Sequence, residues 1–196
     1  MELSEPQQNT LLDLAYQTIV QYLSDQAVPE ARVTDAPLTQ KVGAFVTLRR
    51  YGDLRGCVGH VYADMPLYEV VQQMAISAAE YDMRFMPLTL DEMDDIEIEI
   101  SVLSPLERIS DVKQIEVGTH GLLISKSGRR GLLLPQVATE RGWDRETFLE
   151  ALCDKAGLPP DSWKQGATIH VFSATIFDKH FKQPHAAHAE GALPLA

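Results

Sequence analysis

The chain has 196 residues, in which 17 lysines and arginines face 28 aspartates and glutamates, for a formal net charge of −11. Its apolar fraction of 45% and charged fraction of 23% are those of an ordinary globular protein, and they exclude a chain that is disordered throughout. The acidic balance argues against nucleic acid as a partner, because phosphate contacts need clustered cations. No apolar run reaches the roughly 18 residues that cross a bilayer, so we expect no membrane association.

The first half of the chain predicts one helix followed by a hairpin. Apolar residues recur at helical spacing over 10–24, and Asn9 or Thr10 can cap this helix by accepting a first-turn N–H. Residues 42–50 alternate in polarity as a strand does, and a second strand follows over 54–61 after a short Tyr-Gly-Asp turn.

A second helix and a third strand are expected next. Asp64 can cap the helix, Pro66 is tolerated in its first turn, and its apolar stripe runs to Ala78. Residues 81–87 end it and lead into an acidic loop. The clean alternation over 96–102 predicts a strand with one buried face and one solvated face.

The second half predicts another hairpin, a helix and a last strand. The hairpin joins 122–124 to 132–134, the helix covers about 144–156, and the strand covers 168–177. The order of elements favours an α+β fold with a largely antiparallel sheet flanked by helices. We expect one domain and then a polar tail.

Residues 54–59, Leu-Arg-Gly-Cys-Val-Gly, are the segment that the fold explains least. Two glycines around a cysteine in a strand suggest a bulge, or the close approach of another backbone or a ligand. Strand geometry places Arg55 and Cys57 on one face, where a guanidinium would lower the thiol pKa. His60 could act as a base if the chain bends at Gly59. The alternative is that Cys57 is a small buried hydrophobe and the glycines relieve crowding under a helix.

Other charged segments leave two interpretations open. Asp82 and Arg84 either form an ion pair that fixes the loop, or place Arg84 at a cleft where its planar fork holds a carboxylate or phosphate. The turn 128–131, Gly-Arg-Arg-Gly, is either an exposed hairpin tip or a contact for an acidic partner. The acidic run 91–95 is most simply a solvated loop.

Metal and cofactor binding have little support in the sequence. Cys153 falls on an apolar helical stripe and is interpreted as a core residue, while His185 and His188 fall in the polar tail. No phosphate-binding, dinucleotide-binding, metalloprotease or hydrolase motif is present, so we assign no cofactor and no metal. Two cysteines also exclude a disulfide framework, and we expect a reducing cytoplasm.

Several ordered blocks of the sequence resemble the AMMECR-type domain family. They span nearly the whole ordered chain, about residues 11–177, and so are more specific than any single motif. The matching blocks are 43–48, 54–59, 78–88, 98–105, 121–137 and 152–158.

The resemblance implies one domain over residues 1–180, built as two unequal lobes with a cleft between them, and a flexible tail over 181–196. It also implies a role as component A of the AmmeMemoRadiSam system. The partners would be a Memo-like protein that resembles extradiol dioxygenases and a radical SAM enzyme. No settled biochemical activity comes with the family.

The resemblance also selects candidate site residues. The first family motif matches Arg55, Gly56, Cys57 and Gly59, and the second matches Arg84 and Phe85. The family commonly has proline where Met83 stands and a small polar residue where His60 stands, which weakens His60 as a catalytic base.

Two functions follow from these residues. The first is an accessory or binding domain in which a cleft lined by Cys57, Arg55 and Arg84 takes a small anionic ligand or a partner's segment. The second is an enzyme with Cys57 as nucleophile and Arg84 as the substrate-orienting group. A third option, nucleic-acid binding through Arg49, Arg50, Arg129 and Arg130, is disfavoured by the net charge.

Overall fold

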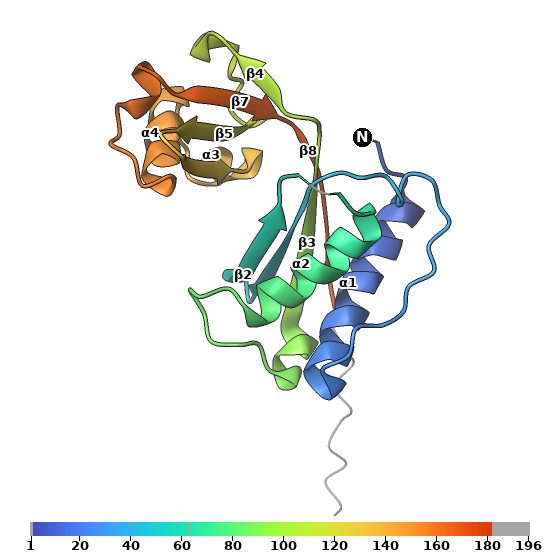
Figure 1. Cartoon of the computed structure of the whole chain (residues 1–196). Helices are drawn as coiled ribbons and strands as arrows, with labels where there is room; N and C mark the ends of the chain where they lie inside the picture. The colour runs from blue at the N-terminus through green and yellow to red at the C-terminus, as the bar shows by residue number, and fades with distance from the viewer. Residues whose placement is uncertain (1, 63, 182–196) are drawn as a thin grey trace, which may run out of the picture.

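The computed structural model describes residues 2–62 and 64–181, which fold into two lobes (Figure 1). Each lobe contains one four-stranded antiparallel sheet. The large lobe holds the order β2-β1-β3-β8 and the small lobe holds the order β4-β7-β5-β6. The α+β class with antiparallel sheets and flanking helices is therefore confirmed, although the strands are divided between two sheets.

The large lobe has two helices on one face of its sheet (Figure 1). Its elements are α1 (Glu5–Asp25), β1 (Ala44–Arg50), β2 (Asp53–His60), α2 (Leu67–Glu80), the 3-10 turn η1 (Leu90–Asp95), β3 (Ile96–Leu103) and β8 (Ala174–His180).

The small lobe packs its longer helix against its own sheet. Its elements are β4 (Glu107–Ile109), η2 (Val112–Gln114), β5 (Gly121–Lys126), β6 (Arg129–Leu133), α3 (Pro135–Glu140), α4 (Arg145–Lys155), η3 (Ser162–Lys164) and β7 (Thr168–Phe172).

Alternation along the central strands builds the core of the large lobe. Val46 and Leu48 of β1 and Ile98 and Ile100 of β3 are fully buried against the helices. Burying each such side chain stabilises the fold by about 1.5–3 kcal/mol. The odd-numbered residues of β1 and β3 therefore face the other side of the sheet, which the helices do not cover.

Two chain crossings and a small apolar cluster join the lobes. The chain passes from β3 into β4 and returns from β7 into β8, and Leu103 at the end of β3 pairs with Ala174 at the start of β8. Leu134 and Phe172 of the small lobe pack with Leu103 in this junction.

The structure corrects three element boundaries. The first helix begins at Glu5, after Ser4, whose N–H donates to Gln7 Oε1 at 2.9 Å, so Asn9 and Thr10 are not its cap. Pro66 rather than Asp64 precedes α2 as its N-cap residue.

The strand predicted over 168–177 is two strands, since the chain leaves one sheet at Phe172 and enters the other at Ala174. The short β4 and α3 had no prediction. Phe181 stacks on Tyr16 with ring centroids 4.2 Å apart, and the predicted tail beyond it lies outside the described residues. None of the helices in the described part of the chain is long and apolar enough to cross a membrane.

Candidate functional site: the cleft between the lobes

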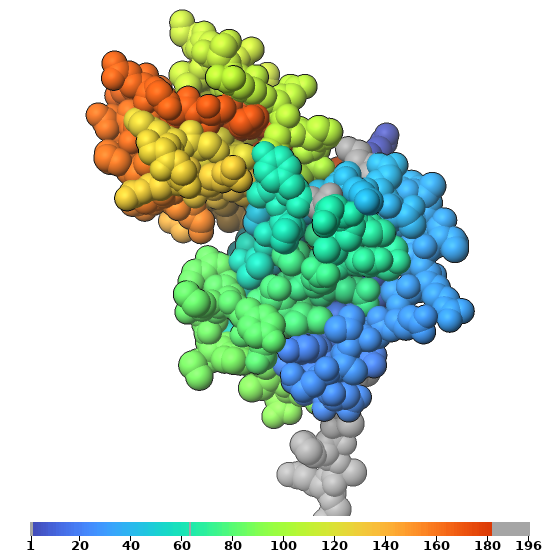
Figure 2. Space-filling view, viewed as in Figure 1, coloured from blue at the N-terminus to red at the C-terminus, as the bar shows by residue number. Residues whose placement is uncertain are grey.

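A cleft of about 620 Å³ lies between the two lobes. Figure 2 shows the surface hollowed where the yellow and orange part of the small lobe meets the large lobe below it. The large lobe forms one wall with residues of its helix-free sheet face, namely Phe45, Thr47, Arg49, Leu54, Cys57 and Glu99, together with Arg84. The small lobe forms the other wall with β6, α3 and α4, including Leu132, Leu134, Gln136, Val137, Glu140, Arg141, Trp143, Asp154 and Lys155.

The register of β1 and β2 places Cys57 in this wall. Cys57 pairs with Thr47, and Thr47 Oγ1 donates to Cys57 Sγ at 3.3 Å. Burial raises the pKa of the Cys57 thiol, although the Thr47 hydrogen bond and the charge of Arg84 act in the opposite direction. The thiol is therefore neutral near pH 7 rather than an activated thiolate.

A bulge in β2 separates Arg55 from Cys57. Leu48 pairs with Gly56 and Arg49 pairs with Leu54, so Arg55 is the extra residue of the bulge. The expectation of a bulge is confirmed, but the expectation that Arg55 and Cys57 share a face is wrong, because the extra residue reverses the alternation. Leu54, not Arg55, lines the cleft.

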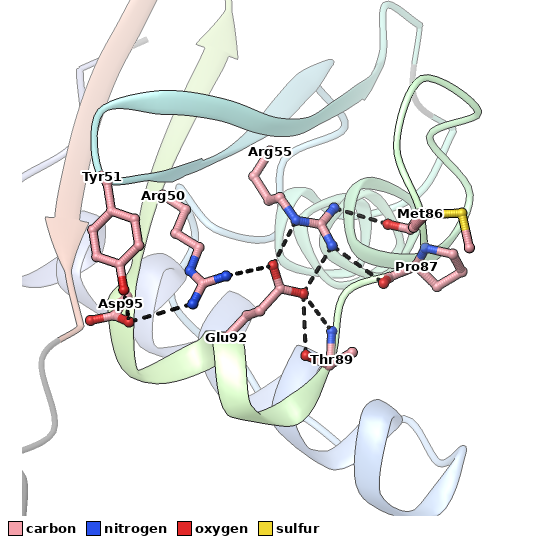
Figure 3. Close-up of polar contacts among 8 residues, drawn as sticks. All are labelled: Arg50, Tyr51, Arg55, Met86, Pro87, Thr89, Glu92 and Asp95. Atoms are coloured by element: carbon pink, nitrogen blue, oxygen red, sulfur yellow. Dashed lines mark hydrogen bonds and ion pairs between the residues drawn. The ribbon is translucent and has the colours of Figure 1, made fainter.

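Arg55 is held by a carboxylate outside the cleft (Figure 3). Its Nε and Nη2 donate to the two oxygens of Glu92 at 2.9 Å each, and its guanidinium also donates to the carbonyl oxygens of Met86 and Pro87. Arg50 reaches the same carboxylate at 3.1 Å. This cluster fastens the loop after α2 to the β2 bulge.

Glu92 was expected in a solvated acidic loop, and that expectation is wrong. The residue lies in η1, and its side chain is only 12% exposed. The hydrogen bonds from Arg55 and then those from Thr89 hold the pKa of Glu92 at about 2, against an ordinary value of 4.5. The carboxylate is therefore ionised at all ordinary pH values.

Arg84 and Asp82 form an ion pair at the edge of the cleft. Arg84 Nη2 lies 2.6 Å from Asp82 Oδ2, and that pairing holds the pKa of Asp82 at about 2. The pair also holds the backbone of Cys57. The Cys57 N–H donates to Asp82 Oδ2 at 2.9 Å, and the Cys57 carbonyl oxygen accepts from Arg84 Nη2 at 3.1 Å. Of the two interpretations of this segment, the ion pair between Asp82 and Arg84 is confirmed. Binding of an anion by Arg84 stays a prediction.

The two motif glycines pack tightly. A Cβ at Gly56 would overlap the Ala78 carbonyl oxygen of α2, and a Cβ at Gly59 would overlap the Phe45 ring. Glycine at 56 therefore lets α2 lie directly on the sheet, which is the crowding that the sequence suggested. Ligand binding by either glycine stays a prediction.

Phe85 and His60 lie outside the cleft lining. Phe85 packs its ring under the Arg84 guanidinium at 5.5 Å. His60 is exposed, and its Nδ1 lies 3.0 Å from the Tyr62 carbonyl oxygen rather than against Cys57. A Cys57–His60 pair is therefore not formed.

Glu99 is one of several cleft residues that sequence reasoning missed, together with Gln136, Arg141, Trp143 and Lys155. The alternation over 96–102 suggested a solvated face, but the small lobe covers part of it, and Ser101 is 0% exposed. Gln136 Nε2 of α3 donates to Glu99 Oε1 at 2.9 Å and to Ser101 Oγ at 3.1 Å. Burial raises the pKa of Glu99. The sequence held no local signal for this burial, because a polar strand face under a second lobe alternates as one in water does.

The cations of the cleft differ in how they are paired. Arg49 Nη2 lies 3.0 Å from Glu140, which leaves little of its charge for a ligand. Arg141 lies over the Trp143 ring at 5.2 Å, and neither it nor Lys155 has an ion pair within the described part of the chain. Asp154 is the other exposed acid of this wall.

The arginines outside the cleft are engaged within the chain or exposed. Arg50 pairs with Glu92 and Asp95, and Arg129 donates to the Gly157 carbonyl. Arg130 is exposed at the hairpin tip. They therefore do not form a cluster of free cations.

Cysteine and histidine positions give no metal site. Among the described residues, no group of three or more histidine, cysteine or acidic side chains could hold a metal ion. Cys153 is 0% exposed in the small-lobe core, which confirms its interpretation as a core residue. His185 and His188 lie outside the described residues.

Comparison with known proteins identifies the family. The AMMECR1 family model matches residues 12–177. The chain belongs to the AMMECR1 family. It is 43% identical to protein MK0488 of Methanopyrus kandleri over 86% of each chain, and 48% identical to protein MJ0810 of Methanocaldococcus jannaschii over 71% of this chain and 74% of the relative.

A solved structure of an AMMECR1 relative has the same fold. The crystal structure of the uncharacterized protein PH0010 from Pyrococcus horikoshii superposes with a TM-score of 0.84 at 41% identity, covering 88% of this chain and 91% of that one. The family membership inferred from the sequence blocks is confirmed. The names of these relatives state no reaction or ligand, so function is argued from the cleft.

Proposed function

We propose that this AMMECR1 domain is a cytoplasmic accessory protein that binds a small anionic ligand in the cleft between its lobes. Support comes from the composition of the cleft: Arg141 and Lys155 have no ion pair within the described residues, and they lie on a wall that also carries Trp143 and leucine side chains. A volume of about 620 Å³ lies within the range of about 300–1,000 Å³ that is common for small-molecule sites.

Binding is better supported than nucleophilic catalysis by Cys57. A nucleophilic thiol needs a lowered pKa or an adjacent base, but burial raises the pKa of Cys57 and His60 lies elsewhere. Arg55, proposed to activate the thiol, is bound to Glu92. Cys57 and Arg84 then act as parts of the wall that the ligand contacts.

The cellular setting is proposed on separate grounds. Cys57 and Cys153 are both free thiols, as expected in a reducing compartment. The family resemblance supports a role as component A of the AmmeMemoRadiSam system, with a Memo-like protein and a radical SAM enzyme as partners. Gel filtration of the three purified proteins of one genome tests this: co-elution supports the assignment, and separate elution of all three contradicts it.

The ligand proposal is tested through the fluorescence of Trp143. In the Trp163→Phe protein, Trp143 is the one remaining tryptophan, since the chain has two. We expect hexanoate to change its emission with an affinity about tenfold above that of hexanol, equivalent to about 1.4 kcal/mol for the anionic group.

A matched pair of lysines provides the control. Lys155→Met keeps the apolar stem but removes the charge from the cleft, and should remove the preference for hexanoate. Lys164→Met removes a cation beside Trp163, outside the cleft lining, and should leave the preference unchanged. Equal binding of hexanoate and hexanol to the parent protein contradicts the proposal.

A further inference from the structure

Glu99 is a largely buried carboxylate without a cationic partner. It lies on β3, a central strand of the sheet, and its hydrogen-bond donor is the neutral amide of Gln136 at 2.9 Å. Among the described residues it takes part in no ion pair. A buried charge is costly unless it is paired, so the cleft holds a charge that the protein leaves uncompensated.

The groups that face Glu99 do not supply the missing charge. Arg49 of β1 attracts it, but that guanidinium is already paired with Glu140 of α3. Glu140 and Asp178 of β8 repel it, and Cys57 of β2 is a neutral thiol near pH 7. Glu99 therefore interacts with two further carboxylates and with one guanidinium that is already paired.

The Gln136 amide adds a second acceptor to this part of the cleft. Its Nε2 donates to both Glu99 and Ser101, while its Oε1 is buried and has no hydrogen bond within the described part of the chain. The amide cannot turn to satisfy Oε1 without losing its donor to Glu99. This part of the cleft lining thus presents an amide oxygen without a donor beside a carboxylate without a cation.

Other residues of the cleft lining have the opposite character. Arg141 and Lys155 are exposed on the small-lobe wall, which also carries two exposed acids, Asp154 and Glu140, the latter paired with Arg49. Apolar side chains, including Leu132 and Trp143, also line the walls. An occupant that matches all three regions needs a donor cation, an apolar body and an anionic group.

We propose that the ligand is a small apolar zwitterion, a hydrophobic amino acid or short peptide, whose ammonium group binds Glu99 and whose carboxylate faces Arg141 and Lys155. This rests on the proposed anion-binding function and adds the cationic end. An ammonium offers three donors and no acceptor, which suits a carboxylate beside an unpartnered amide oxygen. The cleft volume of about 620 Å³ exceeds what one amino acid fills, so a dipeptide is the better probe.

Three forms of one dipeptide test the assignment with the Trp163→Phe protein and Trp143 emission. Leucylleucine has both charges, N-acetyl-leucylleucine lacks the ammonium, and leucylleucine amide lacks the carboxylate. We expect the unmodified dipeptide to bind about tenfold tighter than either modified form. Equal binding of the acetylated form, or of the amide, overturns the proposal. The amide also separates a free peptide from the N-terminus of a longer chain.

Glu99→Gln shows whether the ammonium binds where proposed. This variant should lose about tenfold in affinity for leucylleucine and nothing for the acetylated form. Glu97→Gln is the matched control, because Glu97 lies on the same face of β3 but outside the cleft lining. A loss for both peptides, or for neither, contradicts the assignment to Glu99.

The pH dependence of leucylleucine affinity distinguishes a loss of the Glu99 charge from misfolding of the variant. Burial raises the pKa of Glu99 above its ordinary value of 4.5, so affinity for leucylleucine should fall as the pH drops through this raised pKa. Glu99→Gln should abolish that fall. A fall that persists in Glu99→Gln overturns the proposal.

The two proposals can fail separately. If acetylated and unmodified dipeptides bind equally well, the ammonium subsite is wrong while anion binding stands. If hexanoate and all three dipeptides leave Trp143 emission unchanged, the anion-binding function is wrong as well.

Discussion

The two faces of the large-lobe sheet treat their charged groups differently. On the side of the helices, Arg55 and Arg50 share Glu92, and their bonds also fasten the loop after α2. On the cleft side, Glu99 and Gln136 keep acceptor capacity that the protein does not use. On the helix side both arginines have carboxylate partners, although Arg50 Nε itself is buried without a hydrogen bond. On the cleft side Glu99 has no cationic partner among the described residues, and this is where a ligand can contribute a charge.

The largest expected effect concerns the packing on which the helix-covered face depends. Gly56→Ala places a Cβ against the Ala78 carbonyl oxygen, so α2 must move, and we expect a loss of about 3 kcal/mol in the free energy of unfolding. Gly131→Ala should behave alike, because its Cβ would lie 2.9 Å from the Leu152 carbonyl oxygen of α4. Urea unfolding measures both losses.

A control separates packing from any general effect of replacing glycine. Gly128 lies at the hairpin tip with φ +79°, and a Cβ added there would meet no described atom within 4 Å. Asparagine tolerates that backbone conformation, so Gly128→Asn should cost less than about 1 kcal/mol. A Gly56→Ala protein as stable as the parent would show that α2 does not rest on the sheet at this point.

The next effect compares the two motif arginines. Arg55 is 17% exposed and binds Glu92 through two nitrogens, so Arg55→Lys should lower the free energy of unfolding by about 2–3 kcal/mol. Arg84 is 49% exposed, and Arg84→Lys should cost no more than about 1 kcal/mol. Comparable losses in the two variants, measured by thermal and urea unfolding, would contradict this division.

Sequence reasoning reached the hairpins and the bulge, because polarity alternation and glycine placement are local signals, while the two lobes were implied by the family resemblance. It placed Arg55 on the wrong face, since one extra residue in a bulge reverses the alternation beyond it. It missed Glu99, since a polar strand face under a second lobe has the same pattern as one in water. The role of Glu92 needed the three-dimensional approach of η1 to β2, which no local pattern encodes.

At acid pH the protein should lose the stability that Glu92 contributes on the helix-covered side of the sheet. Glu92 has its folded pKa lowered to about 2 from 4.5. The unfolded chain therefore binds the proton more readily, and the stability from this carboxylate is present above about pH 4.5 and is lost as the pH falls toward 2. Glu92→Gln should be less stable at pH 7 and should lose about 2 kcal/mol less than the parent between pH 5 and 2. The loss that remains includes the share of Asp82, whose pKa is also held at about 2. An unchanged acid profile would argue against the Arg55–Glu92 bond.

The smallest effect is on the reactivity of the cleft thiol. Because burial raises the pKa of Cys57, the rate of its reaction with iodoacetamide should rise only above the ordinary value of about 8.5. Cys57→Ser corrects for any labelling of Cys153, which is fully buried. An inflection well below that value would instead favour a nucleophilic Cys57.

The most direct test of the ligand-binding cleft is the indole N–H signal of each tryptophan in an ¹⁵N-labelled protein. Trp143 lines the cleft, while Trp163 packs against the small-lobe core. We expect that added hexanoate moves the Trp143 signal in a saturable way and leaves the Trp163 signal in place. A Trp143 signal that stays fixed, or that moves only in step with Trp163, would contradict it.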